Sequence, residues 1–412
     1  MALPMSFERR VAWRFLVEGR TQSLLILLGV AAGVAVVAFI TALVTGLQGN
    51  TLSKTLGAQA HITLYSPYDT VIPAAPAASG VHALQTTQPR AQRTRSLSNW
   101  QLLLPLLEAE PGVAAVSPMV AGAGLAQRGE ATQSIALSGI ELPRYDRIVG
   151  LRSKLVSGQP TLEPGDAIIG TQLAADLGIA VGDRLSVLVG NGSTSTRETL
   201  RVTALADLGI RELNRRTVLV PLRTAQSLLG LPGGASSLDV SLVDPWQAQA
   251  LADSFAQRWP YRVESWQASN AQLVSALHAQ TVSTTLIRVV VLLVVVLGIA
   301  SVLVVSVVQK QREIGILRAM GATRAQMLRV FLLQGLWVSA LGSAAGVLLA
   351  ALLVKAFVTF VRGSDGQPLF VLRVDPATAL QAAALATRCG VLAAVVPARR
   401  AAALDPAQAI RL

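Results

Sequence analysis

The sequence predicts a membrane protein with four transmembrane helices and a large mixed α+β extracytoplasmic domain between helices one and two. Three observations predict it: 52% of the 412 residues are hydrophobic with a mean hydropathy of +0.52, the apolar residues gather in four long runs, and one long, less apolar stretch separates the first two runs. A chain of this length with this composition is too apolar for an ordinary soluble protein.

The four apolar runs are each long enough to cross a bilayer, which takes roughly 20 residues. They are Leu24–Leu47, Leu286–Val308, Val330–Val361 and Ala377–Val396. The predicted transmembrane helices built on them are residues 23–48, 284–308, 326–361 and 377–396. The first run is longer than the apolar part of a signal peptide and has no clean small-x-small site at its end, so we do not expect cleavage there.

Basic residues concentrate in three short segments, namely residues 1–22, 310–329 and 397–412. Cytoplasmic segments of membrane proteins carry such an excess of lysine and arginine. We therefore predict that both termini and the loop 309–325 are cytoplasmic, and that the domain 49–283 and the loop 362–376 lie outside. The net charge of +12 then reflects topology, and no nucleic-acid binding is predicted.

The segment before the first run has apolar residues at helical spacing. Phe7, Val11 and Phe15 recur every four residues, Ala12 and Leu16 lie beside them, and arginines fill the other face. This pattern favours an amphipathic helix within residues 1–22 that lies in the cytoplasmic membrane interface. A simple helical extension of the first span is the alternative.

Pairs of glycines four residues apart occur in two of the runs. Gly29 and Gly33 lie in the first run, and Gly342 and Gly346 lie in the third. Small residues at this spacing let membrane helices approach closely. Glycine and alanine are common throughout these runs, however, so a helix-packing role and a purely compositional origin both stay open.

The stretch from residue 49 to residue 283 shows alternating strand and helix signals. Strands are predicted at HITLYS, DAIIG, VGDRLSVLVG, RRTVLVPL and SLDVSLVD, and helices at Trp100–Glu110, TQLAADLG and TAQSLLG. Residues 67–99 are rich in Pro, Ala, Ser, Thr and Gln, which predicts a flexible insertion. The single cysteine, Cys389, lies in the fourth run, so the outer domain must fold without disulfides.

The loop KQREIGILRAMGATRAQMLR combines several helix signals. Ile314, Leu317 and Met320 recur every three residues, which predicts a short amphipathic helix. Gly321 fits the left-handed position just past its end, and Thr323 with Gln326 matches a capping box for the next helix. Such a helix–stop–helix unit could transmit a push from a cytoplasmic partner, although a well-capped loop explains the pattern equally well.

No motif for catalysis occurs in the chain. The phosphate-binding sequence G-x-x-x-x-G-K-[ST] is absent, so the chain is not expected to hydrolyse ATP. His61, His82 and His278 are scattered without thiol neighbours, so no metal site is predicted. We accordingly expect no catalytic residues and no cofactor in this chain.

Two segments carry a family resemblance. EIGILRAMGATRAQMLRVFLLQG resembles the cytoplasmic loop, and PARRAAALDPAQAIR the closing motif, of the ABC-transporter permease family that includes MacB, FtsX, LolC and LolE. VESWQASNAQLVSALHAQ and LGIRELNRRTVLVPLRTAQSLLG are similar to segments of the lipoprotein-release branch, LolC and LolE. The insertion 67–99 departs from the family pattern.

This resemblance implies a partner ATPase that binds ATP and Mg²⁺ and onto which a coupling helix within 309–325 docks. The implied coupling residues are Arg312, Glu313, Gly315, Leu317, Arg318, Gly321 and Ala322. It also implies that the first two spans line a substrate cavity together with a second permease, either another copy or a paralogue. The residues assigned to that cavity are Phe39, Leu43, Leu47, Ile287, Val290 and Val294.

The implied activity is extraction of lipoproteins, or other amphiphiles, from a bacterial inner membrane toward the outer membrane. MacB-like efflux with a periplasmic adaptor and an FtsX-like signalling role are the alternatives, and a periplasmic chaperone and membrane lipid are further possible partners.

Arg388 lies midway along the fourth run, and three roles stay open for it. It could snorkel to an interface, bond to backbone carbonyls or hydroxyls such as that of Thr387, or face a polar cavity or lipid phosphate.

Overall fold

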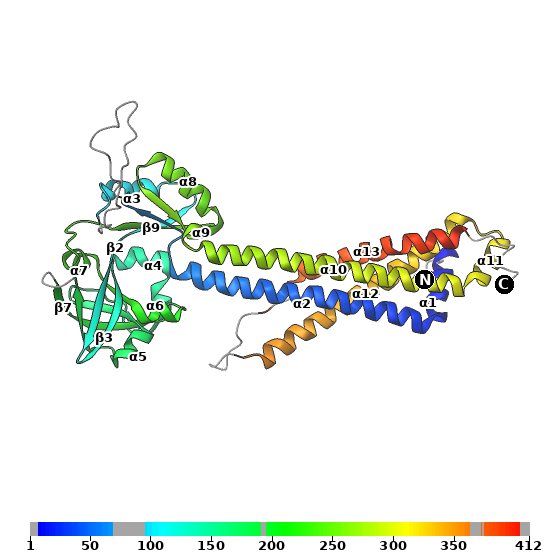
Figure 1. The fold of residues 1–412 in the computed structure, drawn as a ribbon, viewed down its shortest axis with the longest axis horizontal. Coiled ribbons are helices and arrows are strands. Elements are labelled where there is room, and N and C mark those ends of the chain that lie inside the picture. Colours follow the sequence, from blue (N-terminus) through cyan, green and yellow to red (C-terminus); the bar gives the residue numbers. More distant parts are fainter. Residues whose placement is uncertain (1–6, 69–94, 191–194, 363–371, 373–374, 404–412) are drawn as a thin grey trace, which may run out of the picture. The chain divides into compact units, whose positions relative to one another are not determined.

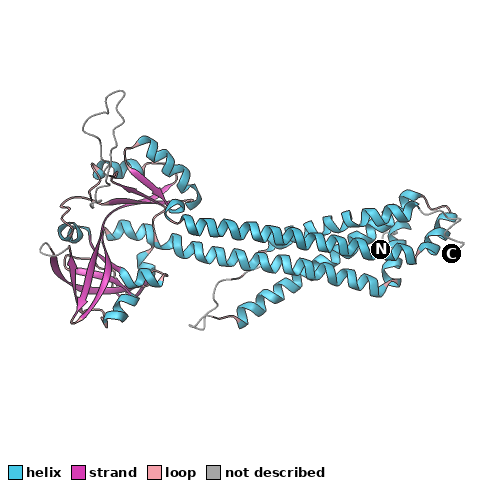
Figure 2. Cartoon of the chain, viewed as in Figure 1, coloured by secondary structure: helices cyan, strands magenta, loops and turns pink. Residues whose placement is uncertain are grey.

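The computed structural model describes residues 7–68, 95–190, 195–362, 372 and 375–403, whose course is shown in Figure 1. The chain divides into two compact units, one formed by residues 1–50 and 275–412 and the other by residues 51–274. In the described residues the first unit is built from helices, whereas the strands of the sheet belong to the second unit (Figure 2).

Six helices lie wholly or largely in the first unit. They are α1 (Phe7–Glu18), α2 (Arg20–Ala58), α10 (Ala271–Gln309), α11 (Gln311–Ala319), α12 (Arg324–Phe360) and α13 (Pro376–Ala403). Four of them, α2, α10, α12 and α13, are long and apolar enough to cross a membrane.

These helices are longer than the predicted spans. Helix α2 continues beyond its apolar run to Ala58, because the polar residues that follow are still compatible with a helix. Helix α13 passes through Pro397 and ends at Ala403, so the first part of the predicted cytoplasmic tail 397–412 is helical. Residues 404–412 lie outside the described residues.

Glycines bring α12 close to α2. A Cβ atom on Gly342 would lie 2.8 Å from the Val30 Cβ, and one on Gly346 would lie 2.7 Å from the Ala31 carbonyl oxygen. A Cβ on Gly33 would collide with the Val295 side chain of α10. Nothing lies within 4 Å of the corresponding position on Gly29. Three of the four glycines therefore lie at helix contacts, and Gly29 does not.

Helix α1 is separate from α2, with a turn at Gly19. Its residues Ala12, Phe15 and Leu16 are buried, and the Phe15 ring lies 6.1 Å from that of Phe331 on α12. Part of the apolar stripe thus packs against the chain itself, because helical periodicity identifies an apolar face but not what covers it. The location of α1 in the membrane interface stays a prediction.

The described part of the second unit contains ten strands and several short helices. The strands are β1 (Ile62–Tyr65), β2 (Val113–Arg128), β3 (Ala131–Ile140), β4 (Leu155–Gly158), β5 (Asp166–Gly170), β6 (Arg184–Val189), β7 (Thr196–Ala206), β8 (Thr217–Pro221), β9 (Ser237–Leu242) and β10 (Arg262–Ser265). The helices are α3 (Trp100–Glu108), α4 (Leu142–Val149), η1 (Leu151–Lys154), α5 (Thr171–Leu177), α6 (Arg211–Arg216), α7 (Leu222–Leu228), η3 (Pro245–Gln247), α8 (Ala248–Arg258) and α9 (Trp266–Ser269).

Six strands close into a ring in the order β2, β3, β8, β5, β7, β6 and back to β2. The ring mixes antiparallel pairs with two parallel ones, β3 with β8 and β5 with β7. Its core holds fully buried aliphatic side chains, among them Leu137, Val187 and Leu200. Strands β1, β9 and β10 extend the sheet from the first half of β2 and cover a second core that includes Phe255 and Trp266.

The predicted strands and helices of this unit are present, with shifted ends. The strand predicted from RRTVLVPL begins only at Thr217, because Arg215 and Arg216 complete helix α6. The helix TQLAADLG ends as predicted, with Gly178 in the left-handed conformation at φ 65°. Of the predicted insertion 67–99, residues 69–94 lie outside the described residues.

Candidate functional site

Helix α11 lies between two sharp breaks in the chain. Lys310 separates it from α10, and Gly321 follows it with a φ of 103°, a conformation that favours glycine. The next helix, α12, begins with a capping box at its N-terminus. The Thr323 hydroxyl accepts a hydrogen bond from the Gln326 N–H at 3.2 Å, and the Gln326 side chain accepts one from the Thr323 N–H at 2.8 Å. The predicted sequence of helix, stop and capped helix is confirmed.

One face of α11 is buried among the ends of other helices. Ile314 is fully buried and Gly315 is buried beside it. The buried apolar cluster around Ile314 draws on α1, α10, α12 and α13, through Ala12, Phe15, Val307, Met327, Val330, Phe331, Ala398, Ala401 and Ala402. Closely packed side chains transmit displacement. A push on α11 is therefore passed directly to these helices.

The opposite face of α11 is open. Arg312 and Glu313 are exposed, and two large apolar side chains accompany them, Ile316 at 45% and Met320 at 80% exposed. Met320, part of the apolar spacing from which the helix was predicted, is exposed, although its N–H still bonds the Ile316 carbonyl at 2.9 Å. Steps of three residues at 3.6 residues per turn carry it around the helix, away from the side of Ile314.

The seven residues assigned to coupling are split between these faces. Arg312, Glu313 and Gly321 are exposed, and Gly315 is buried against the cluster. The remaining three, Leu317, Arg318 and Ala322, are half-buried. Arg318 donates to the Ala402 carbonyl at 3.3 Å. Exposure therefore singles out Arg312, Glu313, Ile316 and Met320 as the surface that a partner could reach, and two of these four were missed from the sequence.

An ion-pair network joins α11 to α1. The Lys310 ammonium lies 2.7 Å from Glu18 and 2.8 Å from Glu313, and Arg14 lies 2.6 Å from Glu18. The hydrogen bonds from Lys310 and Arg14 lower the pKa of Glu18 to about 2. Burial alone would lower the pKa of Lys310, but its bonds to Glu18 and Glu313 outweigh that effect and raise it. Glu18 and Lys310 are therefore both charged at neutral pH.

Only part of this network could be found from the sequence. Lys310 and Glu313 are three residues apart, a spacing at which opposite charges meet on one helix side. Glu18 is 292 residues away from Lys310, and no local pattern connects them. A nearby bond from Gln22 to Gln309, at 2.5 Å, likewise ties the start of α2 to the end of α10.

The six residues assigned to the cavity differ in exposure within the chain. Phe39 and Leu43 pack toward α12, where the Phe39 ring lies 6.2 Å from that of Phe357. Ile287, Val290 and Val294 on α10 are exposed, as is Leu47 on α2. Their role in a cavity shared with a second permease stays a prediction.

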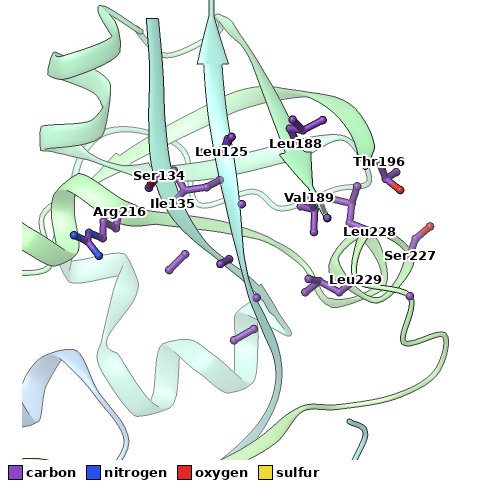
Figure 3. A pocket seen from close by; sticks show the side chains of 17 residues that line it. Leu125, Ser134, Ile135, Leu188, Val189, Thr196, Arg216, Ser227, Leu228 and Leu229 are labelled. Carbon is purple, nitrogen blue, oxygen red and sulfur yellow. The ribbon is translucent and has the colours of Figure 1, made fainter. Parts of the chain in front are cut away.

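A hollow of about 1120 Å³ opens in the second unit (Figure 3). Apolar side chains from β2, β6 and the end of α7 surround it, including Leu125, Leu188 and Leu229. Its one charged lining residue, Arg216, is paired with Glu212 at 2.7 Å. Among the described residues that line the hollow, no pair of titratable groups is suited to acid–base catalysis.

Two carboxyl groups of the same unit are buried, Asp166, which pairs with Arg201 at 3.1 Å, and Asp239. Asp239 on β9 stands between Thr63 on β1 and Ser117 on β2 in the sheet register. Burial raises its pKa to about 7, against a hydrogen bond from Thr63 that lowers it. Burial also raises the pKa of Tyr145, with Asp239 as the second cause. Among the described residues, no group of three His, Cys, Asp or Glu side chains is placed to hold a metal ion.

Two family models match the chain. The MacB-like periplasmic core domain matches residues 23–258, and the FtsX-like permease C-terminal domain matches residues 285–406. The second match includes α11 and the helices that it contacts, except α1.

Relatives of known type cover most of the chain. The lipoprotein-releasing system transmembrane protein LolC of Neisseria meningitidis is 28% identical over 76% of this chain and 82% of its own length. LolE of Haemophilus influenzae is 25% identical over 97% of this chain and 98% of its own length. The macrolide export ATP-binding/permease protein MacB of Agrobacterium fabrum is 25% identical over 98% of this chain and 60% of its own length. With the four apolar helices and the mixed sheet, these matches show that the chain belongs to the MacB/FtsX/Lol family of ABC-transporter permeases.

Proposed function

We propose that this chain is the permease subunit of a transporter in which a separate ATPase drives the extraction of lipoproteins from the inner membrane toward the outer membrane. ATP and Mg²⁺ then bind to the partner ATPase, and this chain supplies the membrane path and the coupling contact. A second permease, either another copy or a paralogue, completes the membrane path. LolC and LolE relatives that match this chain along much of their length support this assignment.

The observation that carries the proposal is the two-sided surface of α11. Its buried side is packed against the ends of α1, α10, α12 and α13, and its open side presents two charged and two apolar side chains. An ATPase that bound the open side would move Ile314 and thereby the helices around it. The residues on the two sides of α11 suit mechanical coupling.

The orientation is also part of the proposal. The basic segments at both ends and around α11 support a cytoplasmic location for them. In a Cys389→Ser background, a membrane-impermeant thiol reagent added from outside should label Gly190→Cys and not Ala322→Cys. The reverse labelling pattern would reject the orientation.

The coupling contact is tested with charge placed on the open face. The full chain, co-expressed with its ATPase, carries Ile316→Glu or Met320→Glu, and Ala325→Glu is the matched control because Ala325 is exposed in the first turn of α12. Buried apolar anchors dominate protein interfaces, so each α11 variant should weaken ATPase association by about tenfold or more. Ala325→Glu should bind as the unchanged chain does. Equal ATPase recovery with all three variants would refute the contact.

The transported cargo is tested by co-purification. Capture of the intact complex from the membrane should recover lipoproteins, and their yield should fall when ATP is supplied. Recovery of a periplasmic adaptor and an outer-membrane duct would instead support efflux, for which the MacB relative provides the precedent. A cell-wall hydrolase in the eluate would support the signalling alternative.

A further inference from the structure

Arg288 is a charged residue in an apolar helix. It lies on α10, two residues after Leu286, where the apolar run begins. The arginine side chain stays protonated under all physiological conditions. A charge at this place costs free energy unless an opposite charge or a hydrogen-bond acceptor meets it.

The surroundings of Arg288 form a narrow apolar groove between α2, α10 and α13. Its lining residues are Gly33, Val34, Val37, Val291, Leu292, Val295, Ala382, Leu385 and Ala386. On α10, Arg288, Val291, Leu292 and Val295 follow helical spacing, so the groove runs along the helix with the arginine toward its outer end. Its enclosed volume is about 30 Å³, about the share of a single water molecule, so a ligand chain would lie against the mouth of the groove and not inside it.

The Nε atom of Arg288 is buried and has no hydrogen-bond partner among the described residues. The apolar runs Leu24–Leu47, Leu286–Val308, Val330–Val361 and Ala377–Val396 contain no Asp or Glu, so no carboxylate from these runs can reach it. A phosphate oxygen from outside the chain would supply the acceptor that this buried N–H lacks.

We propose that this groove binds a phospholipid, with its phosphate on the Arg288 guanidinium and an acyl chain along the apolar wall toward Val295. Two features of the site match this ligand. Arginine bonds phosphate oxygens through parallel N–H groups, and basic pockets between membrane helices bind lipid headgroups. The position of Arg288 at the end of the apolar run places the phosphate at headgroup depth, while the groove extends from there into the apolar region.

The chain offers a matched control for this site. Arg388 on α13 is also an arginine in an apolar helix, but it is exposed and does not line the groove. Removal of its charge changes the net charge equally without touching the proposed contact. Ala382 provides a second variant, because a phenylalanine there would fill the groove and leave Arg288 in place.

The experiment uses the full chain purified in detergent, delipidated and then titrated with phosphatidylglycerol, with bound lipids counted by native mass spectrometry. The tightest site should weaken by about tenfold or more in Arg288→Leu, as expected for loss of a charged hydrogen bond. Ala382→Phe should weaken it as well, Arg288→Lys should keep part of the affinity, and Arg388→Leu should leave it unchanged.

Three outcomes would overturn the proposal. Equal weakening by Arg288→Leu and Arg388→Leu would indicate a general charge effect. Displacement of the lipid by inorganic phosphate alone would indicate an ion site without a chain contact. Loss of self-association in Arg288→Leu with unchanged lipid binding would assign the groove to a second copy of the chain. The readout needs neither ATPase nor cargo, so its result is independent of the proposed transport function.

Discussion

The helices of the first unit meet through small residues, whereas the strands of the second unit meet around large aliphatic side chains. Gly342 and Gly346 let α12 touch the backbone and side chains of α2, and Leu137, Val187 and Leu200 fill the interior of the strand ring. Lipid is as apolar as the side chains, so membrane helices gain little from burial and depend on close approach. Water-exposed domains gain mainly from the burial of apolar surface. The second unit should thus be destabilised most by substitutions that shorten a buried side chain, and the first unit by substitutions that add a side chain to a glycine at a helix contact.

The largest expected effect tests removal of atoms in the second unit. Leu137→Ala should lower the free energy of unfolding of the strand ring by about 2–5 kcal/mol, because a fully buried side chain leaves a cavity. Leu125→Ala is the matched control, since Leu125 is 40% exposed on the neighbouring strand. Thermal unfolding of the full chain in detergent measures both. Equal effects of the two variants would contradict the assigned core.

The second prediction adds a side chain to a glycine at the contact between α2 and α12. Gly346→Leu should destabilise the α2–α12 contact by about 1–3 kcal/mol, since even a Cβ there would lie 2.7 Å from a backbone oxygen. Gly29→Leu has nothing within 4 Å of its Cβ position and should be close to neutral. Crosslinking between cysteines placed on α2 and α12 would report the contact. If Gly29→Leu disrupted it equally, the packing of glycines would be incorrectly assigned.

A third prediction sharpens the comparison through pH. Asp239 has a pKa near 7 in the folded chain, against 3.8 for an ordinary carboxyl group. The folded state binds the proton more tightly, so stability falls as the pH rises from about 4 to 7, by at most about 1.4 kcal/mol per pH unit. Asp239→Asn should remove most of this slope. Unfolding temperatures of both chains at pH 5 and pH 8 test it, and an identical slope would reject the role of Asp239.

The smallest expected effect concerns the network around Lys310. Glu18→Gln removes one ion pair at the surface, and such pairs contribute about 0–1 kcal/mol. The unfolding temperature should hardly change, whereas ATPase stimulation by the complex should fall because α11 loses a link to α1. Glu18→Asp keeps the charge and should retain most of that stimulation. Unchanged ATPase stimulation in Glu18→Gln, with normal folding, would show that the pair does not position α11.

Local patterns predicted some parts of the molecule well. The stop at Gly321, the capping box of Thr323 and Gln326, and the turn at Gly178 depend on neighbouring residues, and each is found where the sequence placed it. Strand β2 was not predicted. Its sequence VAAVSPMVAGAGLAQR is rich in alanine and glycine, which have low strand propensity, and it forms a strand because β3, β6 and β9 pair with it.

Contacts between distant segments could not be predicted. The pairing of Glu18 with Lys310 and the burial of Phe15 against Phe331 depend on how helices far apart in sequence come together. The burial of Ile314 depends in the same way on residues of α1, α12 and α13 that gather around it.

Strand β2 belongs to both cores of the second unit. Its residues 113–119 pair with β9, and residues 119–128 pair with β3, with β6 alongside. Amide hydrogen exchange along this strand depends on local unfolding both around β9 and around β3 and β6. If the lobe around β9 opened alone, protection would be lost from residues 113–119 and kept from 120 onward, with the boundary inside one continuous strand. Exchange rates along β2 would therefore show whether the two cores open as one cooperative unit or as two.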